Sequence, residues 1–388
     1  MKRCMAVLLV DALGHRLLEQ TPGLRDRFPH RRRLETILGF SSGALPTLFS
    51  GRLPDSHGRW LMYRRAGTGV AGDRRRSPFS GFEALALVPP RIARGPRLSR
   101  LLSRVVARRG VRGYFHLYDV PRTMLPAFDL PERDDVFAPG GLPVESIWDT
   151  LDRRGVRWRG WNWRVPEEQS LAETLAAVGG GDTLLFCYTA ELDAALHREG
   201  SRGPTVRSRL ERYGAWVDQV EQAARARGVE LWLYLLSDHG MVDVTSTADV
   251  MGALGARGIA WPRDVLAFFD STLARFWWRG AAARDTVRGT LAALPGGRWL
   301  TAAERAAAGV AFPDHDYGED VWLADPGVLI VPSFMGRDAV AAMHGYDPSH
   351  PDMAAVLASN RPLPPGVAHL KDVRAFLESE LDALAVAA

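Results

Sequence analysis

The sequence predicts a doubly wound α/β fold built on a mostly parallel sheet. Three short apolar runs, each followed by an acidic residue, carry this prediction: Met5 to Val10, Thr183 to Tyr188, and Leu231 to Leu236. Continuous apolar runs of this length are typical of parallel strands that are buried on both faces. Helical patterns lie between the runs, and alternating strands and helices favour a sheet with helices on both sides.

The clearest helical pattern spans Ser208 to Arg227. Its apolar residues recur on one face of a helix at Leu210, Tyr213, Trp216, Val217 and Val220. In doubly wound folds the functional groups collect beyond the carboxyl ends of the strands. We therefore expect the acidic residues that follow the three strands to lie together at one edge of the sheet.

Two stretches interrupt the strand and helix alternation. Residues 59–141 are rich in Arg, Pro and Gly, which predicts an inserted basic cap, and residues 246–325 carry their own strand and helix signals, which predict a small α/β subdomain. Residues 1–58, 142–245 and 326–388 are expected to form the core. A chain of 388 residues is long enough for this arrangement.

The composition is that of a globular enzyme, with 46% hydrophobic residues and a formal net charge of +4. Cys4 and Cys187 both lie in apolar runs and make neither a disulfide framework nor a cysteine-rich metal site. The apolar start, Met1 to Val10, is too short for a secretory signal, and no segment reaches the ~18 apolar residues of a membrane span. We expect a cytoplasmic protein.

Two residue pairs have the spacing of metal ligands. Asp193 and His197 are four residues apart, which places a carboxylate and an imidazole on one face of a helix. Asp238 and His239 are adjacent at the end of a predicted strand and precede a glycine. The first pair could also serve at the surface or as a cap, and the second could form a turn.

Three further residues complete a candidate constellation. Asp11 follows the first strand, His344 lies near the carboxyl terminus, and Ser41 precedes a predicted apolar helix. Each has a structural alternative: a helix cap, a hydrogen-bonded core histidine and a helix start. Taken together with the two pairs, they supply three carboxylates, three imidazoles and one hydroxyl.

In this order along the chain, the motifs resemble the type I phosphodiesterase and nucleotide pyrophosphatase branch of the alkaline phosphatase superfamily. The segments that carry the resemblance are Asp11, Ser41 to Gly58, Asp193 with His197, Ser237 to Met241, and His344 to Met353. The resemblance implies an alkaline phosphatase-like core with two divalent metal ions, usually zinc, with manganese and iron as alternatives.

The resemblance also implies a role for each residue. One metal would be held by Asp11, Asp238, His239 and the nucleophile, and the other by Asp193, His197 and His344. The family places its nucleophile nine residues before a Thr or Ser that precedes Gly. Counting back from Ser50 gives Ser41, which would hold the first metal as well, with Ser42 as the rival nucleophile.

The expected function is hydrolysis of a phosphodiester or pyrophosphate through a phosphoserine intermediate. A phosphomonoesterase with the same centre is the alternative, because a phosphomonoesterase can use the same ligands. A metal-binding or membrane-peripheral protein without catalysis is a further alternative. The expected partner is a small phosphate ester.

The predicted cap is rich in arginine, and thirteen arginines lie between residues 64 and 112: Arg64, Arg65, Arg74, Arg75, Arg76, Arg91, Arg94, Arg97, Arg100, Arg104, Arg108, Arg109 and Arg112. They could face solvent, bind a polyanionic substrate, or contact an anionic membrane surface transiently. Nucleic acid is not expected, because no recognised nucleic-acid module accompanies the charge. Nearby, Trp158, Trp161 and Trp163 could pack in the core or stack on a base or sugar.

Overall fold

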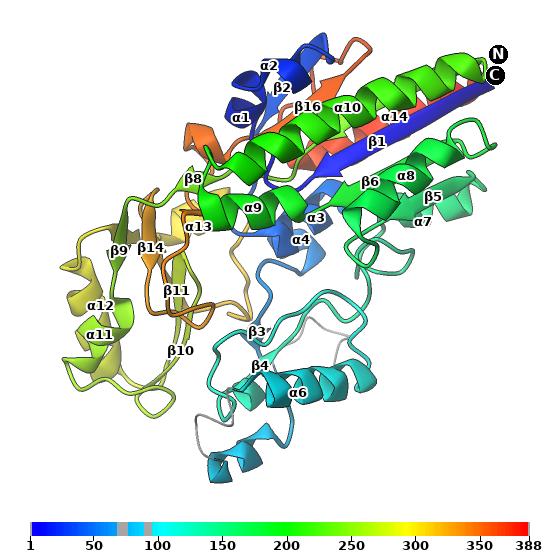
Figure 1. Cartoon of the computed structure of the whole chain (residues 1–388). Helices are drawn as coiled ribbons and strands as arrows, with labels where there is room; N and C mark the ends of the chain where they lie inside the picture. The colour runs from blue at the N-terminus through cyan, green and yellow to red at the C-terminus, as the bar shows by residue number, and fades with distance from the viewer. Residues whose placement is uncertain (1, 68–76, 89–94, 387–388) are drawn as a thin grey trace.

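A computed structural model describes residues 2–67, 77–88 and 95–386, and within these residues the central sheet has six strands (Figure 1). In spatial order they are β2 (His30–Leu34), β16 (Ala355–Ser359), β7 (Val229–Leu236), β1 (Lys2–Val10), β6 (Leu184–Thr189) and β5 (Trp158–Trp161). β1 is parallel to β6 and β7, β5 is parallel to β6, and β16 is antiparallel to both of its neighbours. The predicted α/β fold with a mostly parallel sheet is confirmed.

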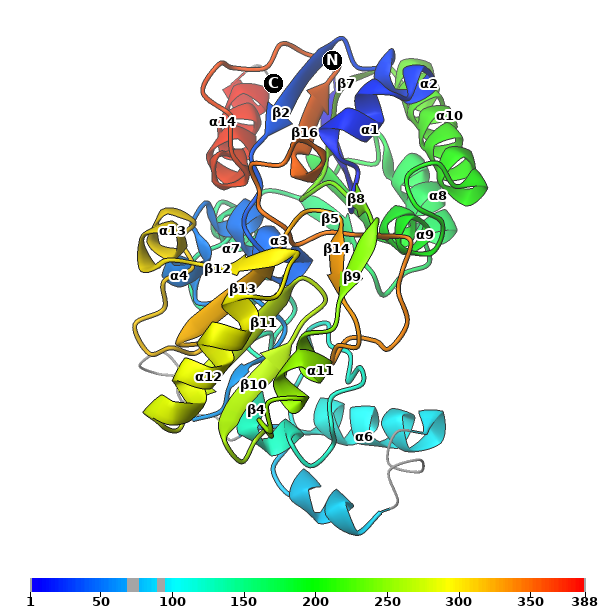
Figure 2. The ribbon, with the colours of Figure 1, turned by 90° about the vertical axis from the view of Figure 1, so that its left-hand side faces the viewer.

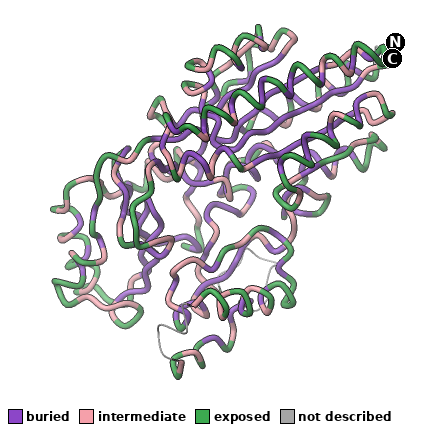
Figure 3. Tube along the Cα trace, viewed as in Figure 1, coloured by how far each residue is buried: buried purple, intermediate pink, exposed green. Residues whose placement is uncertain are grey.

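Side chains of β1 alternate between two hydrophobic clusters, as the two-residue period of a strand requires. Met5, Val7 and Leu9 belong to one cluster, and Cys4, Ala6 and Leu8 to the other. The first face is covered by α3 (Ser41–Ser50), α7 (Ile147–Arg153) and α14 (Val373–Val386). The second is covered by α1 (His15–Glu19), α2 (Pro22–Arg25), α8 (Glu167–Ala177), α9 (Glu191–Glu199) and α10 (Pro204–Ala226). Figure 3 shows that the strands between these layers are largely buried.

The helix predicted from Ser208 to Arg227 is α10, which begins four residues earlier. Gly203 precedes its first turn and Pro204 is the first helical residue. Proline suits that position because its φ angle is already helical and its missing N–H has no partner there. None of the helices in the described part of the chain combines the length and apolar character needed to cross a bilayer.

The stretch predicted as a cap contains short elements that lie beside the sheet rather than within it (Figure 1). After α4 (Pro54–His57) they are β3 (Arg64–Arg65), η1 (Phe82–Leu87), α6 (Pro96–Arg108), η2 (Leu125–Ala127) and β4 (Phe128–Asp129). β3 pairs with β4, and the buried Arg64 guanidinium donates to Asp129 at 3.0 Å. Of the predicted cap arginines, Arg74, Arg75, Arg76, Arg91 and Arg94 lie outside the described residues.

A second, antiparallel sheet lies in the region predicted as a subdomain (Figure 2). Its strands, in spatial order, are β10 (Val265–Phe269), β11 (Leu273–Trp278), β13 (Asp320–Ala324) and β12 (Gly297–Trp299), accompanied by α11 (Val250–Gly255), α12 (Ala281–Ala292) and α13 (Ala302–Ala307). β9 (Ser246–Ala248) pairs with β14 (Val328–Ile330), and β8 (Val242–Asp243) pairs with β15 (Ala342–Met343). Two further 3-10 helices, the element type labelled η, are η3 (Pro351–Met353) and η4 (Leu370–Asp372).

One hydrophobic cluster runs through the core, the cap and the second sheet. Phe49 of the core, Phe82 of the cap and Phe268 of the second sheet all belong to it. The three predicted regions therefore share packing, and their boundaries stay predictions.

Candidate metal centre

The carboxyl ends of three neighbouring strands, β6, β1 and β7, converge on one edge of the central sheet. Asp11 directly follows β1, and Asp238 lies two residues beyond the end of β7. Both carboxylates are buried, with only 4% of Asp11 and none of Asp238 exposed. This is the edge at which we expected the acidic residues to gather.

Asp11, Asp238 and His239 form the first cluster, in which one potential ligand atom from each residue lies within 4.8 Å of the others. His239 Nε2 is 3.4 Å from Asp11 Oδ1 and 3.4 Å from Asp238 Oδ2. Ser41 Oγ is 2.9 Å from the same nitrogen. Two carboxylates, one imidazole and one hydroxyl thus face a common point.

The hydrogen bond on the far side of the ring orients His239. Its Nδ1 is 3.0 Å from the carbonyl oxygen of Gly240. A carbonyl can only accept a hydrogen bond, so Nδ1 carries the proton and Nε2 keeps its lone pair for the cluster. Such a backbone bond on the outer ring nitrogen is typical of histidines that bind metals.

Asp193, His197 and His344 form the second cluster under the same 4.8 Å criterion. Asp193 and His197 lie on α9, where the four-residue spacing brings Asp193 Oδ1 within 3.3 Å of His197 Nε2. His344 Nε2 lies 3.6 Å from the same oxygen. His197 Nδ1 donates to the Ala342 carbonyl at 2.8 Å, which leaves its Nε2 free for the cluster.

Burial and neighbouring charges shift the pKa values of three residues in the two clusters. Burial, followed by the negative charges of Asp238 and Asp193, raises the pKa of Asp11 well above its usual value. Burial, followed by the nearby His239 and His197, holds the pKa of His344 well below its usual value. For His197, burial alone would lower the pKa, but the nearby Asp193 carboxylate outweighs it and raises the pKa.

Several atoms of these residues also lack partners within the described part of the chain. Asp11 Oδ1, Asp238 Oδ2, Asp193 Oδ1 and His344 Nδ1 are buried without a hydrogen bond. Leaving such groups unsatisfied is costly, whereas a divalent cation would satisfy the oxygens and offset the clustered negative charge. Mixed carboxylate and imidazole donors suit zinc and related metals, so the residues present fit two such ions.

Ser41 and Ser42 differ in where their hydroxyls point. Ser41 is the first residue of α3, and its hydroxyl reaches His239. Ser42 Oγ instead donates to the Trp60 carbonyl at 3.1 Å. Of the two serines, therefore, Ser41 brings its hydroxyl to the first cluster.

Two residues beside the first cluster were not anticipated from sequence. Tyr188 donates its hydroxyl to Asp11 Oδ2 at 2.5 Å, and its position at the end of a predicted strand was the available signal. The backbone N–H of Ala12 donates to Asp238 Oδ1 at 3.3 Å. Ala12 has a φ of 64°, a left-handed conformation that costs free energy in a residue with a side chain and that clusters at functional sites.

The three tryptophans of residues 158–163 have different environments. Trp158 stacks on Trp148 with ring centroids 4.9 Å apart, and Trp161 is buried. Trp163 is 37% exposed and packs edge-on against Tyr114, with centroids 5.4 Å apart. Packing thus accounts for two of the three rings, while Trp163 stays partly exposed, with the Arg164 guanidinium 4.3 Å from its ring centroid.

A serine hydroxyl beside carboxylates and imidazoles, at the edge of a doubly wound sheet, is the arrangement expected of phosphoric ester hydrolases of the alkaline phosphatase superfamily. Comparison with protein-family models supports this class. The model described as type I phosphodiesterase/nucleotide pyrophosphatase matches residues 5–347. The chain belongs to this metal-dependent family and is a phosphoric ester hydrolase.

Solved structures show the same fold. Human ectonucleotide pyrophosphatase/phosphodiesterase 5 superposes with a TM-score of 0.68 at 13% identity, covering 98% of this chain and 95% of the human chain. The murine protein gives a TM-score of 0.68 at 15% identity with the same coverage. An inactive variant of the murine protein in complex with AMP gives 0.67 at 15% identity, again covering 98% of this chain and 95% of its own. No curated protein sequence matches this chain.

Proposed function

We propose that this protein hydrolyses phosphodiesters or pyrophosphates through a phosphoserine intermediate on Ser41. The observation that carries the proposal is the 2.9 Å approach of Ser41 Oγ to His239 Nε2, within a cluster that also contains Asp11 and Asp238. A free serine hydroxyl is a weak nucleophile, and it needs this kind of surrounding to react.

Two divalent cations would complete the site. Asp11, Ser41, Asp238 and His239 would hold one, and Asp193, His197 and His344 the other. When bound, the cations would supply charge neutralisation for the phosphoryl group and a lower pKa for the serine hydroxyl. Zinc is the proposed metal, and elemental analysis would distinguish it from manganese and iron.

The chain's own residues then account for the chemical steps. Ser41 Oγ loses its proton to solvent and forms a bond to phosphorus as the bond from phosphorus to the leaving oxygen breaks, and the leaving oxygen takes up a proton from solvent. Because Ser41 begins the ten-residue helix α3, the positive end of the helix dipole favours the negative charge that develops there. A water oxygen then bonds to phosphorus as the bond between phosphorus and Ser41 Oγ breaks, which releases a phosphomonoester from a diester substrate, while Ser41 Oγ takes up a proton and becomes a hydroxyl again.

An accessible aromatic pair supports a nucleotide-like substrate. Tyr114 is 45% exposed and Trp163 is 37% exposed, so their rings offer a stacking surface. Burial, followed by the negative charges of Asp193 and Asp11, raises the pKa of the Tyr114 hydroxyl. The murine relative in complex with AMP agrees with a substrate of this kind. Tyr114→Ala should raise KM about tenfold for a dinucleotide and leave a methyl phosphodiester unchanged.

Turnover of bis(p-nitrophenyl) phosphate and p-nitrophenyl phosphate by metal-loaded protein tests the proposal. We expect the diester to be the better substrate, and Asp238→Ala to be inactive while the exposed control Asp285→Ala remains active. A strong preference for the monoester would instead identify a phosphomonoesterase. Absence of turnover with two bound ions would identify a metal-binding protein without catalysis.

A further inference from the structure

Helix α6 carries a row of arginines on one face. Arg97, Arg100, Arg104 and Arg108 recur at three- and four-residue intervals, which places them on the same side of a helix. All four are exposed. On the opposite side, Leu102 and Val106 are buried in the hydrophobic core. The basic face of α6, defined by these four arginines, therefore points away from the body of the molecule.

Within the described residues, nothing neutralises this face. Residues 95–112 contain no Asp or Glu, and none of the four arginines forms an ion pair there, whereas Arg112 lies 4.0 Å from Asp134. Like charges at four-residue spacing destabilise a helix. On α10, by contrast, the charge of Arg212 is neutralised by an ion pair with Glu168 at 2.7 Å. The basic face of α6 is thus costly to the isolated protein.

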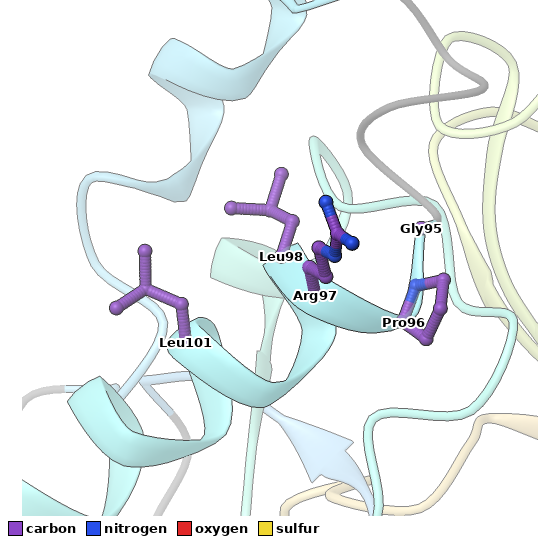
Figure 4. Close-up of a pocket in the computed structure, with 5 residues that line it drawn as sticks. All are labelled: Gly95, Pro96, Arg97, Leu98 and Leu101. Carbon is purple, nitrogen blue, oxygen red and sulfur yellow. The ribbon is translucent and has the colours of Figure 1, made fainter.

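Apolar side chains are exposed beside the basic face. Leu101 is 51% exposed, and with Leu98 and Arg97 it lines an open surface pocket at the start of the helix (Figure 4). Leu87, at the end of η1, is 91% exposed. Both α6 and η1 lie at the lower end of the molecule in Figure 1, whereas the amino and carboxyl termini lie at its upper right. A basic face bordered by accessible leucines is the pattern of a helix that lies in a lipid interface.

We propose that α6 docks the protein on an anionic lipid surface. The arginines would contact the lipid head groups, and Leu101 and Leu87 would enter the outer edge of the acyl layer. In this arrangement the four arginines bind the lipid surface rather than a phosphate ester at the metal centre. This docking is independent of the proposed catalytic function.

Sedimentation of the full-length protein with vesicles tests the proposal. We expect binding to phosphatidylcholine vesicles that contain phosphatidylglycerol, and little binding to phosphatidylcholine alone. High salt should weaken the binding, because screening reduces the attraction between the arginines and the lipids. Arg100→Gln/Arg104→Gln should lower the affinity by about tenfold or more. Leu87→Ser/Leu101→Ser should also lower it, without reducing the salt dependence.

The matched control is Arg257→Gln/Arg279→Gln. It removes the same charge from exposed positions outside the cap and should bind like the wild type. Equal losses in both arginine variants would show an effect of net charge alone and would overturn the proposal, as would a lack of binding at low salt. Tighter binding of single-stranded RNA with the same arginine dependence would instead assign the face to nucleic acid. Circular dichroism checks that each variant is folded.

Discussion

The imidazole rings of His239 and His344 stack with their centroids 3.9 Å apart and their planes 13° apart. One ring belongs to the first cluster and the other to the second, so the two candidate metal sites are in direct contact through these rings. A substitution of either histidine should therefore change metal binding at both sites.

His344→Asn tests this coupling. It removes one of three donors from the second cluster and also the ring that packs on His239. We expect the metal content after zinc loading to fall from two equivalents to one or fewer, measured by elemental analysis of purified protein. His30→Asn, outside the clusters, should keep the wild-type metal content. Two tightly bound equivalents in His344→Asn would contradict its assignment as a ligand.

Ser41→Ala and Ser42→Ala separate the two candidate nucleophiles. Only the Ser41 hydroxyl reaches His239, whereas Ser42 Oγ bonds to a backbone carbonyl. We expect kcat for a diester to fall at least about 1,000-fold in Ser41→Ala and less than about tenfold in Ser42→Ala. Mass spectrometry of quenched reactions should locate the phosphoryl group on Ser41. The reverse order of activity would make Ser42 the nucleophile.

Removing metal should destabilise the protein. Without cations, the buried oxygens of Asp11, Asp238 and Asp193 lack partners. Binding at concentrations far above Kd contributes roughly 4 kcal/mol to stability. A chelator should therefore lower Tm by several degrees, and added zinc should restore it. The same treatment of Asp238→Ala should have a much smaller effect, and an equal effect would mean that the metal binds elsewhere.

His57 should make stability depend on acid pH. Its Nδ1 accepts from the Arg59 amide, and its Nε2 therefore carries the proton toward Thr47. Burial, followed by the positive charge of Arg59, lowers the pKa from 6.5 to about 3. The neutral ring thus contributes its full stability above pH 6.5, and this contribution is lost as the pH falls toward 3. The loss reaches roughly 3 kcal/mol near pH 4.

Urea unfolding of wild type and His57→Gln across this range measures the effect. Gln cannot gain a proton, so the difference in unfolding free energy between the two proteins should shrink as the pH falls. A difference that stays constant would show that His57 does not titrate on unfolding.

Arg275 forms a buried pair that should be costly to break. The side chain donates from Nε to Asp270 at 2.8 Å and from Nη1 to the Tyr63 carbonyl at 2.7 Å. Arg275→Leu leaves the Asp270 carboxylate buried without its partner and should cost about 3–5 kcal/mol in urea unfolding. The exposed control Arg279→Leu should change little. Arg275→Leu/Asp270→Asn should recover part of the loss, and no recovery would mean that the Arg275 packing matters more than its charge.

The local sequence determined much of the fold and part of the site. A short, continuous apolar run is typical of a strand that is buried on both faces, so the composition and length of three such runs predicted β1, β6 and β7. The meeting of Asp193 and His197 followed from helical spacing, because four residues make about one turn. The basic character of α6 also followed from its sequence.

Only the tertiary structure decided which side chains meet across long separations. Ser41 and Ser42 are adjacent and chemically identical, and packing of Trp60 against α3 gives one hydroxyl a carbonyl partner and leaves the other at the cluster. Similarly, Trp158 and Trp163 share one motif, yet Trp148 covers the first and not the second. The sequence by itself determined the residue types and local geometry of the site. Long-range packing, which no local pattern encodes, decided which groups face it.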